Sequence, residues 1–506
     1  MLSRPLAIIT SNLHFSLGFL ALFCALIAPS LFVTNAHAAS VNSQKVNKFN
    51  QAFTKRVNRE FHNHNIPGGA FVIVKNNQII ALETFGHTDK SKKQKITPET
   101  IFRLASVSKP FAATITTMLA QEQQLQLNEP VTNYVENFSL AQKGAADKIQ
   151  VKHVLSHTTG LMPNTYDNLL HENWSMDKIV GRFDRLSPIC QPEKCYGYQN
   201  IAYGFLAPIV EAIQNKSYAD IVDERIFQPL AMNNASIGFD VYDSKHPKNA
   251  NTAKPHILIK RNKLKRKDSQ GNSLYKYIWR TVKVTPDYYK VPAAAGVNAS
   301  ITDMSKWLMA NLGHNPDVLS AQLLAEMTAP RVKTKRDLRR RYWREHMKDA
   351  HYGYGWRIYQ LEQHPIVYHS GWVAGFRADI GYSPDLDLGF AMLINAESNV
   401  ISKLSSKFWQ TAHKTFERVE SPMRLGQTPM PTELSTASES AVSQKTAETT
   451  VSKKTLAQNN AELSQPKLSQ VEHSKSTEDS PVAQSIPMNA QEMRAQLKPK
   501  SKIKDD

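Results

Sequence analysis

Two strand–turn–strand patterns, one near each end of the apolar part of the chain, limit the fold most strongly. The first joins β-rich runs at 70–74 and 79–84 through the turn-like segment KNNQ, and the second joins runs at 378–382 and 388–395 through SPDLD. Helix-like patterns lie between them, at 106–123 and 201–213. Strands at both ends with helices between them predict an α+β fold rather than a doubly wound α/β fold.

The first 38 residues have the composition of a targeting segment. Arg4 precedes an apolar run at 15–33, and the run is followed by the small-residue sequence AHA at 36–38. This pattern predicts a signal peptide (1–38) that is cleaved after Ala38, and therefore a periplasmic or secreted protein. An uncleaved membrane anchor is the alternative, because the run approaches the length needed to span a bilayer, although Pro29 argues against it.

The other end of the chain also differs from a folded domain. From Ser421 to Asp506 there is no Phe, Trp or Tyr, and small polar and charged residues dominate. Such a segment buries too little apolar surface to fold, so 421–506 is predicted to be a disordered tail. No internal repeat is apparent, which leaves 39–420 as one catalytic domain.

Two of the three cysteines remain after the predicted cleavage, and they lie close together. Cys190 and Cys195 are separated by four residues. In an oxidising compartment this spacing predicts a local disulfide that fixes the geometry of its loop. It is poor evidence for a zinc site, because two further ligands at matching spacing are not apparent.

The net charge of +18 comes mostly from two basic runs. Residues 245–290 contain 13 basic and 2 acidic residues, and residues 331–349 contain 9 and 3. Neither run has the period of a core helix, so both are predicted to be insertions or surface loops. In an exported protein such runs indicate binding to an anionic envelope surface, or they serve solubility alone. Binding to nucleic acid is not expected.

A nucleophile motif begins the helix-like segment at 106–123. Ser106 and Lys109 form an S-x-x-K tetrad, and Pro110 fits the first turn of a helix. Three residues on a helix bring the two side chains to one face, where a desolvated lysine can activate the serine hydroxyl. The spacing alone is weak evidence, because it recurs at Ser175, Ser273, Ser464 and Ser501.

The surroundings of Ser106 make the motif specific. The segments TIFRLA before it, LNEPV after its helix and VKHVLSHTTGL at 151–161 resemble the serine β-lactamase-like superfamily of class C β-lactamases, D,D-peptidases and serine esterases. The resemblance covers about residues 41–416. It implies an antiparallel sheet flanked by helices, with a mostly helical subdomain. His157, within the third segment, is interpreted as a structural residue beside the active site.

The same resemblance assigns roles to a Tyr-x-Asn motif. By this carry-over, Tyr198 shuttles the proton of Ser106 and Asn200 holds the amide or ester of the substrate. A phenol has an ordinary pKa near ~10, so Tyr198 needs Lys109 close by to act at neutral pH. Neighbouring Tyr196 and Tyr203 are interpreted as packing residues.

A third element follows at 369–372. His369-Ser370-Gly371 occupies the place of the family's Lys-Thr-Gly or His-x-Gly on a predicted strand, and the resemblance implies that Ser370, Gly371 and Trp372 bind substrate. Gly371 is expected to let substrate approach the strand edge, because a side chain there would obstruct it. The backbone N–H groups of Ser106 and Trp372 are the implied oxyanion hole. His369 is expected to donate to substrate or to tune the Tyr198–Lys109 network, or else to be a structural strand-end histidine.

Together these features predict an exported serine hydrolase that forms an acyl-enzyme on Ser106, without a metal or organic cofactor. A D,D-peptidase or esterase is favoured over a β-lactamase, because His369-Ser370-Gly371 replaces Lys-Thr-Gly. The substrate is expected to be a small molecule or a fragment derived from peptidoglycan. A non-catalytic envelope-binding protein that retains the fold is the alternative from another functional class.

Overall fold

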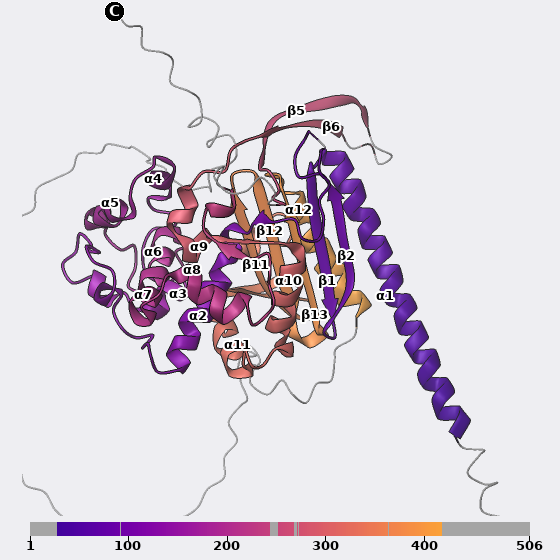
Figure 1. The fold of residues 1–506 in the computed structure, drawn as a ribbon, viewed down its shortest axis with the longest axis horizontal. Helices are drawn as coiled ribbons and strands as arrows, with labels where there is room; N and C mark the ends of the chain where they lie inside the picture. Colours follow the sequence, from indigo (N-terminus) through magenta and orange to yellow (C-terminus); the bar gives the residue numbers. More distant parts are fainter. Residues whose placement is uncertain are drawn as a thin grey trace, which may run out of the picture. The chain divides into compact units, whose positions relative to one another are not determined.

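An eight-stranded antiparallel sheet forms the centre of the computed structural model (Figure 1). In spatial order its strands are β2 (Gln78–Gly86), β1 (Gly68–Lys75), β13 (Leu388–Ile394), β12 (Phe376–Ser383), β11 (Pro365–Val373), β10 (Arg357–Leu361), β9 (Met347–Tyr352) and β8 (Val332–Lys333). The structure describes residues 28–91, 93–242, 251–267, 271, 273–362 and 364–416, with side chains from residue 43 onward. Strands from the two ends of the domain thus lie side by side, as the α+β prediction requires.

Both predicted strand–turn–strand units are confirmed. β1 pairs with β2 through a two-residue turn at Asn76 and Asn77, whose φ angles are 49° and 59°. Positive φ at both central residues matches the right-handed twist of a hairpin, and asparagine tolerates it better than most residues. At the other end, β12 pairs with β13 around a short helical turn at Pro384–Leu386.

Helices cover both faces of the sheet, because its strands are apolar on both sides. Along β1, Phe71 and Ile73 contact one core, whereas Ala70, Val72 and Val74 contact the other. The first core is covered by α1 (Ala28–His64) and α12 (Val400–Thr415), and the second by α10 (Ile301–Met309) and the helices behind it. We call the first side the α1/α12 face and the second the α10 face.

Aromatic packing attaches α1 to the sheet. Phe49, Phe53, Val57 and Phe61 recur every four residues, so they lie along one side of the helix. The ring of Phe53 lies 5.5 Å from that of Phe390 on β13, and Phe408 of α12 stacks on Phe390 at 4.2 Å. The two helices therefore share one aromatic core with the sheet.

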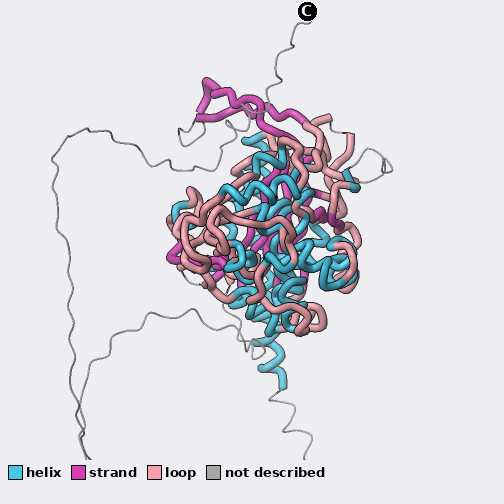
Figure 2. Tube along the Cα trace, turned by 90° about the vertical axis from the view of Figure 1, so that its left-hand side faces the viewer, coloured by secondary structure: helices cyan, strands magenta, loops and turns pink. Residues whose placement is uncertain are grey.

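A mostly helical region lies on the α10 face, as the family resemblance implied (Figures 1 and 2). Its helices are α2 (Lys109–Gln121), α3 (Val151–Leu155), α4 (Asp167–His171), α5 (Met176–Gly181), α6 (Asn200–Gly204), α7 (Leu206–Gln214), α8 (Tyr218–Val222), α9 (Pro292–Ala295) and α11 (Ala321–Thr328). A small sheet of β3 (Phe102–Arg103), β7 (Val297–Ala299) and β4 (Ser236–Ile237) adjoins them. The helix predicted at 201–213 is divided between α6 and α7.

Part of the first basic run forms a hairpin, which agrees with the predicted insertion and not with the alternative of a surface loop. Strands β5 (His256–Lys267) and β6 (Ser273–Thr281) pair antiparallel and stand out from the rest of the domain (Figure 2). The hairpin stays attached because Trp279 is buried and its indole N–H donates to the carbonyl of His64 at the end of α1. Its basic side chains nevertheless remain exposed, as predicted.

The second basic run is also not a surface loop. Residues 331–349 supply β8 and the beginning of β9, and they bury Trp343 and Asp337. The interpretation failed because it considered only charge, whereas the tryptophan and methionine of this run pack into the α1/α12 core. Arginines can hold a charged group at the surface while the rest of the segment is buried.

The predictions for the two ends of the chain concern mainly residues outside the described range. The side chains at the predicted cleavage site and the whole predicted tail at 421–506 lie outside it. Within the described residues, no helix is long and apolar enough to cross a membrane. The domain boundaries at 38 and 420 remain predictions.

Candidate active site

The candidate nucleophile lies in a strained turn before α2. Ser106 belongs to a 3₁₀ turn at Ala105–Ser108, and the α-helix begins only at Lys109, not at Ser106 as predicted. Ala105 has a φ of 51°, a left-handed conformation that is unfavourable for a residue with a side chain. The turn leaves Ser106 partly exposed while burying its neighbours. Strain of this kind is frequent at functional sites.

The buried ammonium group of Lys109 lies beneath Ser106 and makes three polar contacts. Its ammonium nitrogen lies 3.5 Å from Ser106 Oγ, 2.7 Å from Asn200 Oδ1 and 3.1 Å from the carbonyl of Ala294 in α9. The side chain is buried, and burial holds the pKa of Lys109 well below its ordinary value. A lysine in this state is able to accept a proton from the neighbouring hydroxyl.

Tyr198 completes the polar cluster around the serine. Its hydroxyl hydrogen-bonds Ser106, and the face of its ring lies 4.6 Å from the Lys109 nitrogen. Burial raises the pKa of Tyr198 to about 12, although Arg357 and the bond to Ser106 lower it in part. Tyr198 is therefore a neutral phenol near pH 7, which favours a proton relay over a phenolate.

His157 positions the Tyr-x-Asn segment, in agreement with its predicted structural role. Its Nδ1 accepts the backbone N–H of Gln199 at 3.3 Å, and its carbonyl accepts the N–H of Gly197 at 2.8 Å. The imidazole lies against the Tyr198 ring, with centroids 4.3 Å apart. Burial lowers the pKa of His157 far enough to keep the ring neutral.

The predicted disulfide is present just before this segment. Cys190 and Cys195 are bonded, and the loop that they close leads directly to Tyr196 and Tyr198. The carbonyl of Cys190 also lies against Gly160, where a Cβ would come within 2.2 Å of it. The disulfide therefore fixes the approach of this loop to the segment around His157.

Strand β11 borders the nucleophile with an edge that is open beyond Tyr368. β10 pairs with β11 from Pro365 to Tyr368, and among the described residues no other strand pairs with 369–373 on that side. β11 also contacts the turn that holds Ser106. An extended substrate could add its backbone to such an edge.

The reason for Gly371 differs from the prediction. A Cβ on Gly371 would lie 2.0 Å from the carbonyl oxygen of Leu104 and 3.2 Å from the Cβ of Ala105. The glycine therefore makes room for the turn that carries Ser106, not for a substrate. The prediction recognised a close approach but assigned it to the wrong group.

His369 is buried, which argues against its predicted donation to substrate. Nothing of its surface is exposed, and its ring nitrogens bond the hydroxyl of Tyr352 at 3.1 Å and the carbonyl of Ser370 at 3.1 Å. Burial, together with Arg357 and Lys109, keeps the pKa of His369 well below its ordinary value. Of the expected roles, indirect tuning of the Lys109 network and a structural role remain.

The side chains of Ser370 and Trp372 lie on the α1/α12 face, away from Ser106. Ser370 Oγ accepts a hydrogen bond from Arg340 at 3.4 Å, and the guanidinium of Arg377 lies 4.6 Å from the centroid of the Trp372 ring. Because side chains alternate along a strand, residues 370 and 372 cannot share the face of Gly371. The predicted substrate contact of Ser370 is therefore limited to its backbone, whereas the predicted role of Trp372 uses its backbone N–H and is unaffected.

Sequence reasoning missed Asp167, which lies behind Asn200. The Asn200 amide N–H donates to Asp167 Oδ2 at 2.7 Å, while Asn200 Oδ1 accepts from Lys109. Burial raises the pKa of Asp167 to about 7, partly offset by Asn200 and Lys109. Asn200 thus orients Lys109 and keeps one amide N–H for a substrate, so its predicted role is reduced rather than removed. No motif in the sequence marked Asp167.

An arginine that the sequence did not single out lies beside Tyr198. Arg357 of β10 forms an ion pair with Asp337, a residue of the second basic run. Its guanidinium lies 5.5 Å from the rings of both Tyr198 and Tyr352. This fixed positive charge lowers the pKa values of Lys109 and Tyr198, which keeps more of Lys109 in the neutral form that can accept a proton.

The other S-x-x-K tetrads within the described residues have no comparable surroundings. Ser175 is the N-cap of α5 and accepts the backbone N–H of Lys178, whose side chain is exposed. Ser273 and Lys276 lie on β6, where a spacing of three puts side chains on opposite faces. Ser464 and Ser501 lie outside the described residues.

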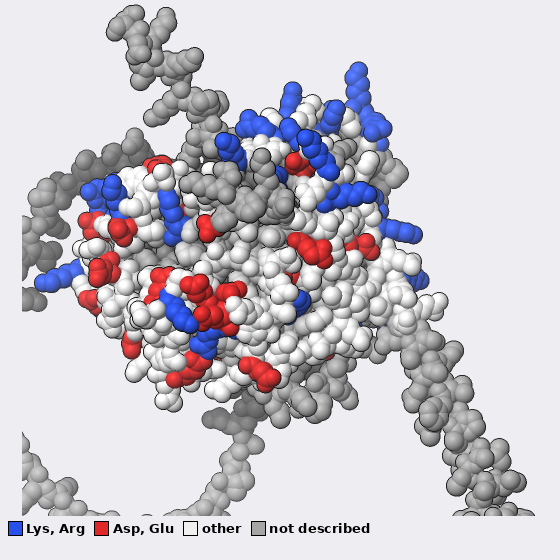
Figure 3. Space-filling model, viewed as in Figure 1, with Lys and Arg blue, Asp and Glu red and all other residues white. Residues whose placement is uncertain are grey.

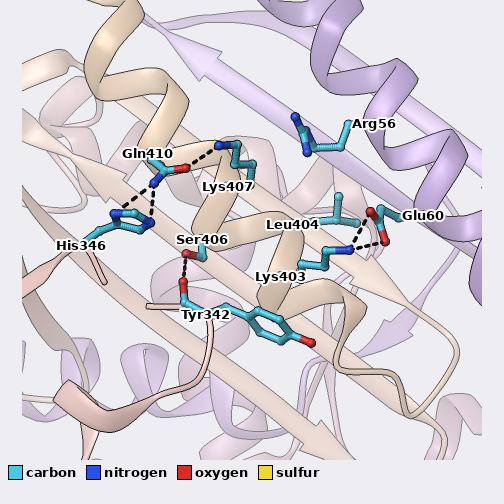
Figure 4. Close-up of a pocket in the computed structure, with 9 residues that line it drawn as sticks. All are labelled: Arg56, Glu60, Tyr342, His346, Lys403, Leu404, Ser406, Lys407 and Gln410. Atoms are coloured by element: carbon cyan, nitrogen blue, oxygen red, sulfur yellow. Dashed lines mark hydrogen bonds and ion pairs between the residues drawn. The ribbon is translucent and has the colours of Figure 1, made fainter. Parts of the chain in front are cut away.

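A separate surface pocket lies between α1 and α12 (Figure 4). Arg56, Lys403 and Lys407 contribute basic groups, and Lys403 forms an ion pair with Glu60 at 2.8 Å. Its serine, Ser406, donates to the backbone carbonyl of Tyr342 and has no lysine base bonded to it in Figure 4. The pocket is on the α1/α12 face and does not belong to the Ser106 cluster.

Comparison with known proteins identifies the domain. The family model described as Beta-lactamase matches residues 49–403, which is most of the chain. The chain belongs to the beta-lactamase family. This match covers every residue of the candidate active site, from Ser106 to Trp372. It establishes a hydrolase family and the fold predicted from the sequence.

Individual members of the beta-lactamase family are distant from this chain. Protein flp of Staphylococcus aureus (strain MW2) is 24% identical over 359 residues, which cover 69% of this chain and 63% of that protein. Unguisins hydrolase ungD' of Aspergillus campestris is 25% identical over 319 residues, 61% of this chain and 54% of that protein. The matches thus span less than two thirds of these relatives.

A solved structure supports the same beta-lactamase fold. The octameric penicillin-binding protein homologue from Pyrococcus abyssi matches with a TM-score of 0.56 and 24% sequence identity. The match covers 72% of this chain and 77% of that one. At this identity the similarity concerns the fold alone.

Proposed function

We propose that this chain is an exported serine hydrolase that transfers the acyl group of an amide or ester to Ser106 and then to water. The observation that carries the proposal is the burial of Lys109 within bonding distance of Ser106, Asn200 and Ala294. A non-catalytic protein gains nothing from placing a lysine there, because burying a cation is unfavourable. The similarity to a protein named as a hydrolase agrees with this function.

The proposed reaction begins with proton transfer from the serine. Ser106 Oγ attacks the carbonyl carbon, and its proton passes to the neutral amine of Lys109, directly or through the Tyr198 hydroxyl. Tyr198, with its pKa raised to about 12, gives its proton to the leaving group as it takes the proton of Ser106 from protonated Lys109, so it ends the step as a neutral phenol and Lys109 as a neutral amine. Water then releases the acyl group by the reverse proton path.

The negative charge that develops on the carbonyl oxygen of the substrate requires hydrogen-bond donors beside Ser106. The backbone N–H groups of Ser106 and Trp372 are the proposed oxyanion hole, because the open edge of β11 borders the turn of Ser106. One such donor contributes roughly 3 kcal/mol to the transition state. This role uses the backbone of Trp372, so it is unaffected by the position of the indole.

The substrate class is proposed to be that of a D,D-peptidase or esterase rather than a β-lactamase. The test compares kcat/KM for a D-alanyl-D-alanine peptide, a short p-nitrophenyl ester and a chromogenic cephalosporin, with Ser106→Ala as the baseline. The peptide or the ester is expected to exceed the cephalosporin. Faster cephalosporin turnover would instead assign a β-lactamase, and no Ser106-dependent turnover of any of the three would contradict the proposal.

Asp167→Asn is expected to shift the pH profile of the reaction. The charge of Asp167 raises the pKa of Lys109, so its removal lowers that pKa further and extends the neutral, basic form of Lys109 to lower pH. Asparagine still accepts the bond from Asn200, which keeps the geometry. Because the pKa of Asp167 is about 7, the change is expected above that pH.

The measurement for this variant is kcat/KM for a neutral ester between about pH 5 and pH 9, where the profile reports groups of the free enzyme. The acidic limb of Asp167→Asn should lie at lower pH than that of the parent. Asp184→Asn, at an exposed aspartate, is the matched control. Superimposable profiles for the two variants would show that Asp167 does not act on Lys109.

A further inference from the structure

Basic side chains are concentrated on the elements of the α1/α12 face. Residues 43–64 of α1 contain five Lys or Arg and one Glu, and α12 contains three Lys and no acidic residue. Strands β5 and β6 together contain eight Lys or Arg and no acidic residue, and the sequence between them adds Asp268. By contrast, residues 109–242, which supply the helices beside Ser106, contain 10 basic and 14 acidic residues. The net charge is therefore carried on one side of the domain.

Packing joins these elements into one surface. The ring of Tyr277 on β6 lies 4.8 Å from that of His64 at the end of α1, and Trp279 belongs to the same core as α1 and α12. Tyr342 of the second basic run packs against this core as well, next to the exposed Arg341 and Arg344. Figure 3 shows Lys and Arg gathered over the hairpin. We call this surface the basic face.

The hairpin exposes basic side chains together with one large apolar side chain, that of Ile259. Lys260, Lys276 and Arg280 are exposed, and none of them forms an ion pair with an acidic group of the described residues. Ile259, beside Lys260, is 47% exposed. Positive side chains interspersed with aliphatic groups fit the headgroup region of an anionic lipid bilayer, whereas a purely polar polyanion makes no use of the isoleucine.

We infer that the basic face docks on an anionic phospholipid surface, with the β5–β6 hairpin as its principal contact. Docking in this way leaves the α10 face, which holds Ser106, directed away from the lipid. The inference concerns binding alone and does not depend on the proposed reaction.

The test is sedimentation of the full chain with phospholipid vesicles. Affinity is measured for phosphatidylcholine vesicles with and without about a third of phosphatidylglycerol, and the ratio of the two affinities removes any contribution of the apolar N-terminal run. The parent is expected to prefer the anionic vesicles strongly at low salt and to lose most of this preference as salt screens the charges.

The decisive variant is K260Q/K276Q/R280Q on the hairpin. Its preference for anionic vesicles should fall about a hundredfold, because each basic residue near such a surface adds about tenfold or somewhat less to the binding affinity. The matched control is K143Q/K148Q/K178Q, which removes the same charge from exposed positions of the helical region and should bind like the parent. Equal losses in the two triple variants would overturn the inference, because net charge alone would then explain binding.

A second variant distinguishes lipid from a soluble polyanion. Ile259→Ser should weaken vesicle binding about fivefold by removing apolar contact with the bilayer, and it should leave binding to polyphosphate unchanged. If the parent protein binds polyphosphate but does not bind anionic vesicles, the basic face binds a soluble polymer, and the inference is contradicted. Unchanged thermal unfolding midpoints verify that each variant is folded.

Discussion

Lys109→Met is expected to lower kcat/KM about a thousandfold, within the range lost when a general base is removed. Methionine fills nearly the same volume but cannot accept the proton of Ser106. The stability should change little, because two effects oppose each other. Asn200 Oδ1 and the carbonyl of Ala294 lose a donor, while the unfavourable burial of an amine disappears.

The chain supplies a matched control for this variant. Lys178 stands three residues after Ser175, like Lys109 after Ser106, but its side chain is exposed on α5. Lys178→Met should retain full activity. Kinetics and thermal unfolding of both variants are the measurements. A Lys109→Met enzyme within tenfold of the parent would show that another group accepts the proton.

Gly371→Ala is expected to destabilise the domain by about 3 kcal/mol, at the upper end of the usual cost of overpacking, and to abolish acylation of Ser106. The new Cβ would lie 2.0 Å from the carbonyl oxygen of Leu104, a backbone atom that moves only if the turn of Ser106 moves with it. Chemical unfolding measures the first effect, and the rate of serine labelling measures the second.

Gly181→Ala is the control for the glycine variant. Nothing lies within 4 Å of a Cβ at Gly181, the last residue of α5, so the substitution should be neutral or slightly stabilising. If Gly371 instead made room for substrate, Gly371→Ala would keep the parent's stability and lose activity only toward bulky substrates. That result would contradict the role of Gly371 in making room for the turn of Ser106.

The sequence predicted what depends on local pattern and order along the chain. Local pattern predicted the hairpins at both ends, the Ser106–Lys109 tetrad and the Cys190–Cys195 disulfide. The structural role of His157 came from the family resemblance. The family resemblance added the fold, which the family match confirms.

The errors have a common physical cause, because they concern which way a side chain points after folding. Ser370 was predicted to contact substrate, although strand alternation turns its side chain to the α1/α12 face. The second basic run was taken for a surface loop, yet its Asp337 holds Arg357 beside Tyr198. Such contacts join residues far apart in the chain, so periodicity and spacing carry no signal for them.

Asp167 illustrates the same limit at the active site. The carboxylate lies 31 residues before Tyr198 in the sequence, outside every motif, but its bond to Asn200 connects it to Lys109. A buried carboxyl group with a raised pKa beside a buried lysine is a feature that only the folded arrangement creates.

Intact-mass spectrometry after treatment with a serine-directed phosphonate and, separately, with a penicillin shows whether Ser106 is the nucleophile. We expect rapid addition of one label by at least one reagent, complete loss of labelling in Ser106→Ala, and normal labelling in Ser175→Ala, whose serine stands in an exposed tetrad of the same spacing. A long-lived penicillin adduct would favour a D,D-peptidase, and labelling by phosphonate alone an esterase. Labelling that persists in Ser106→Ala, or no adduct with either reagent, would contradict the assignment of Ser106 as the nucleophile.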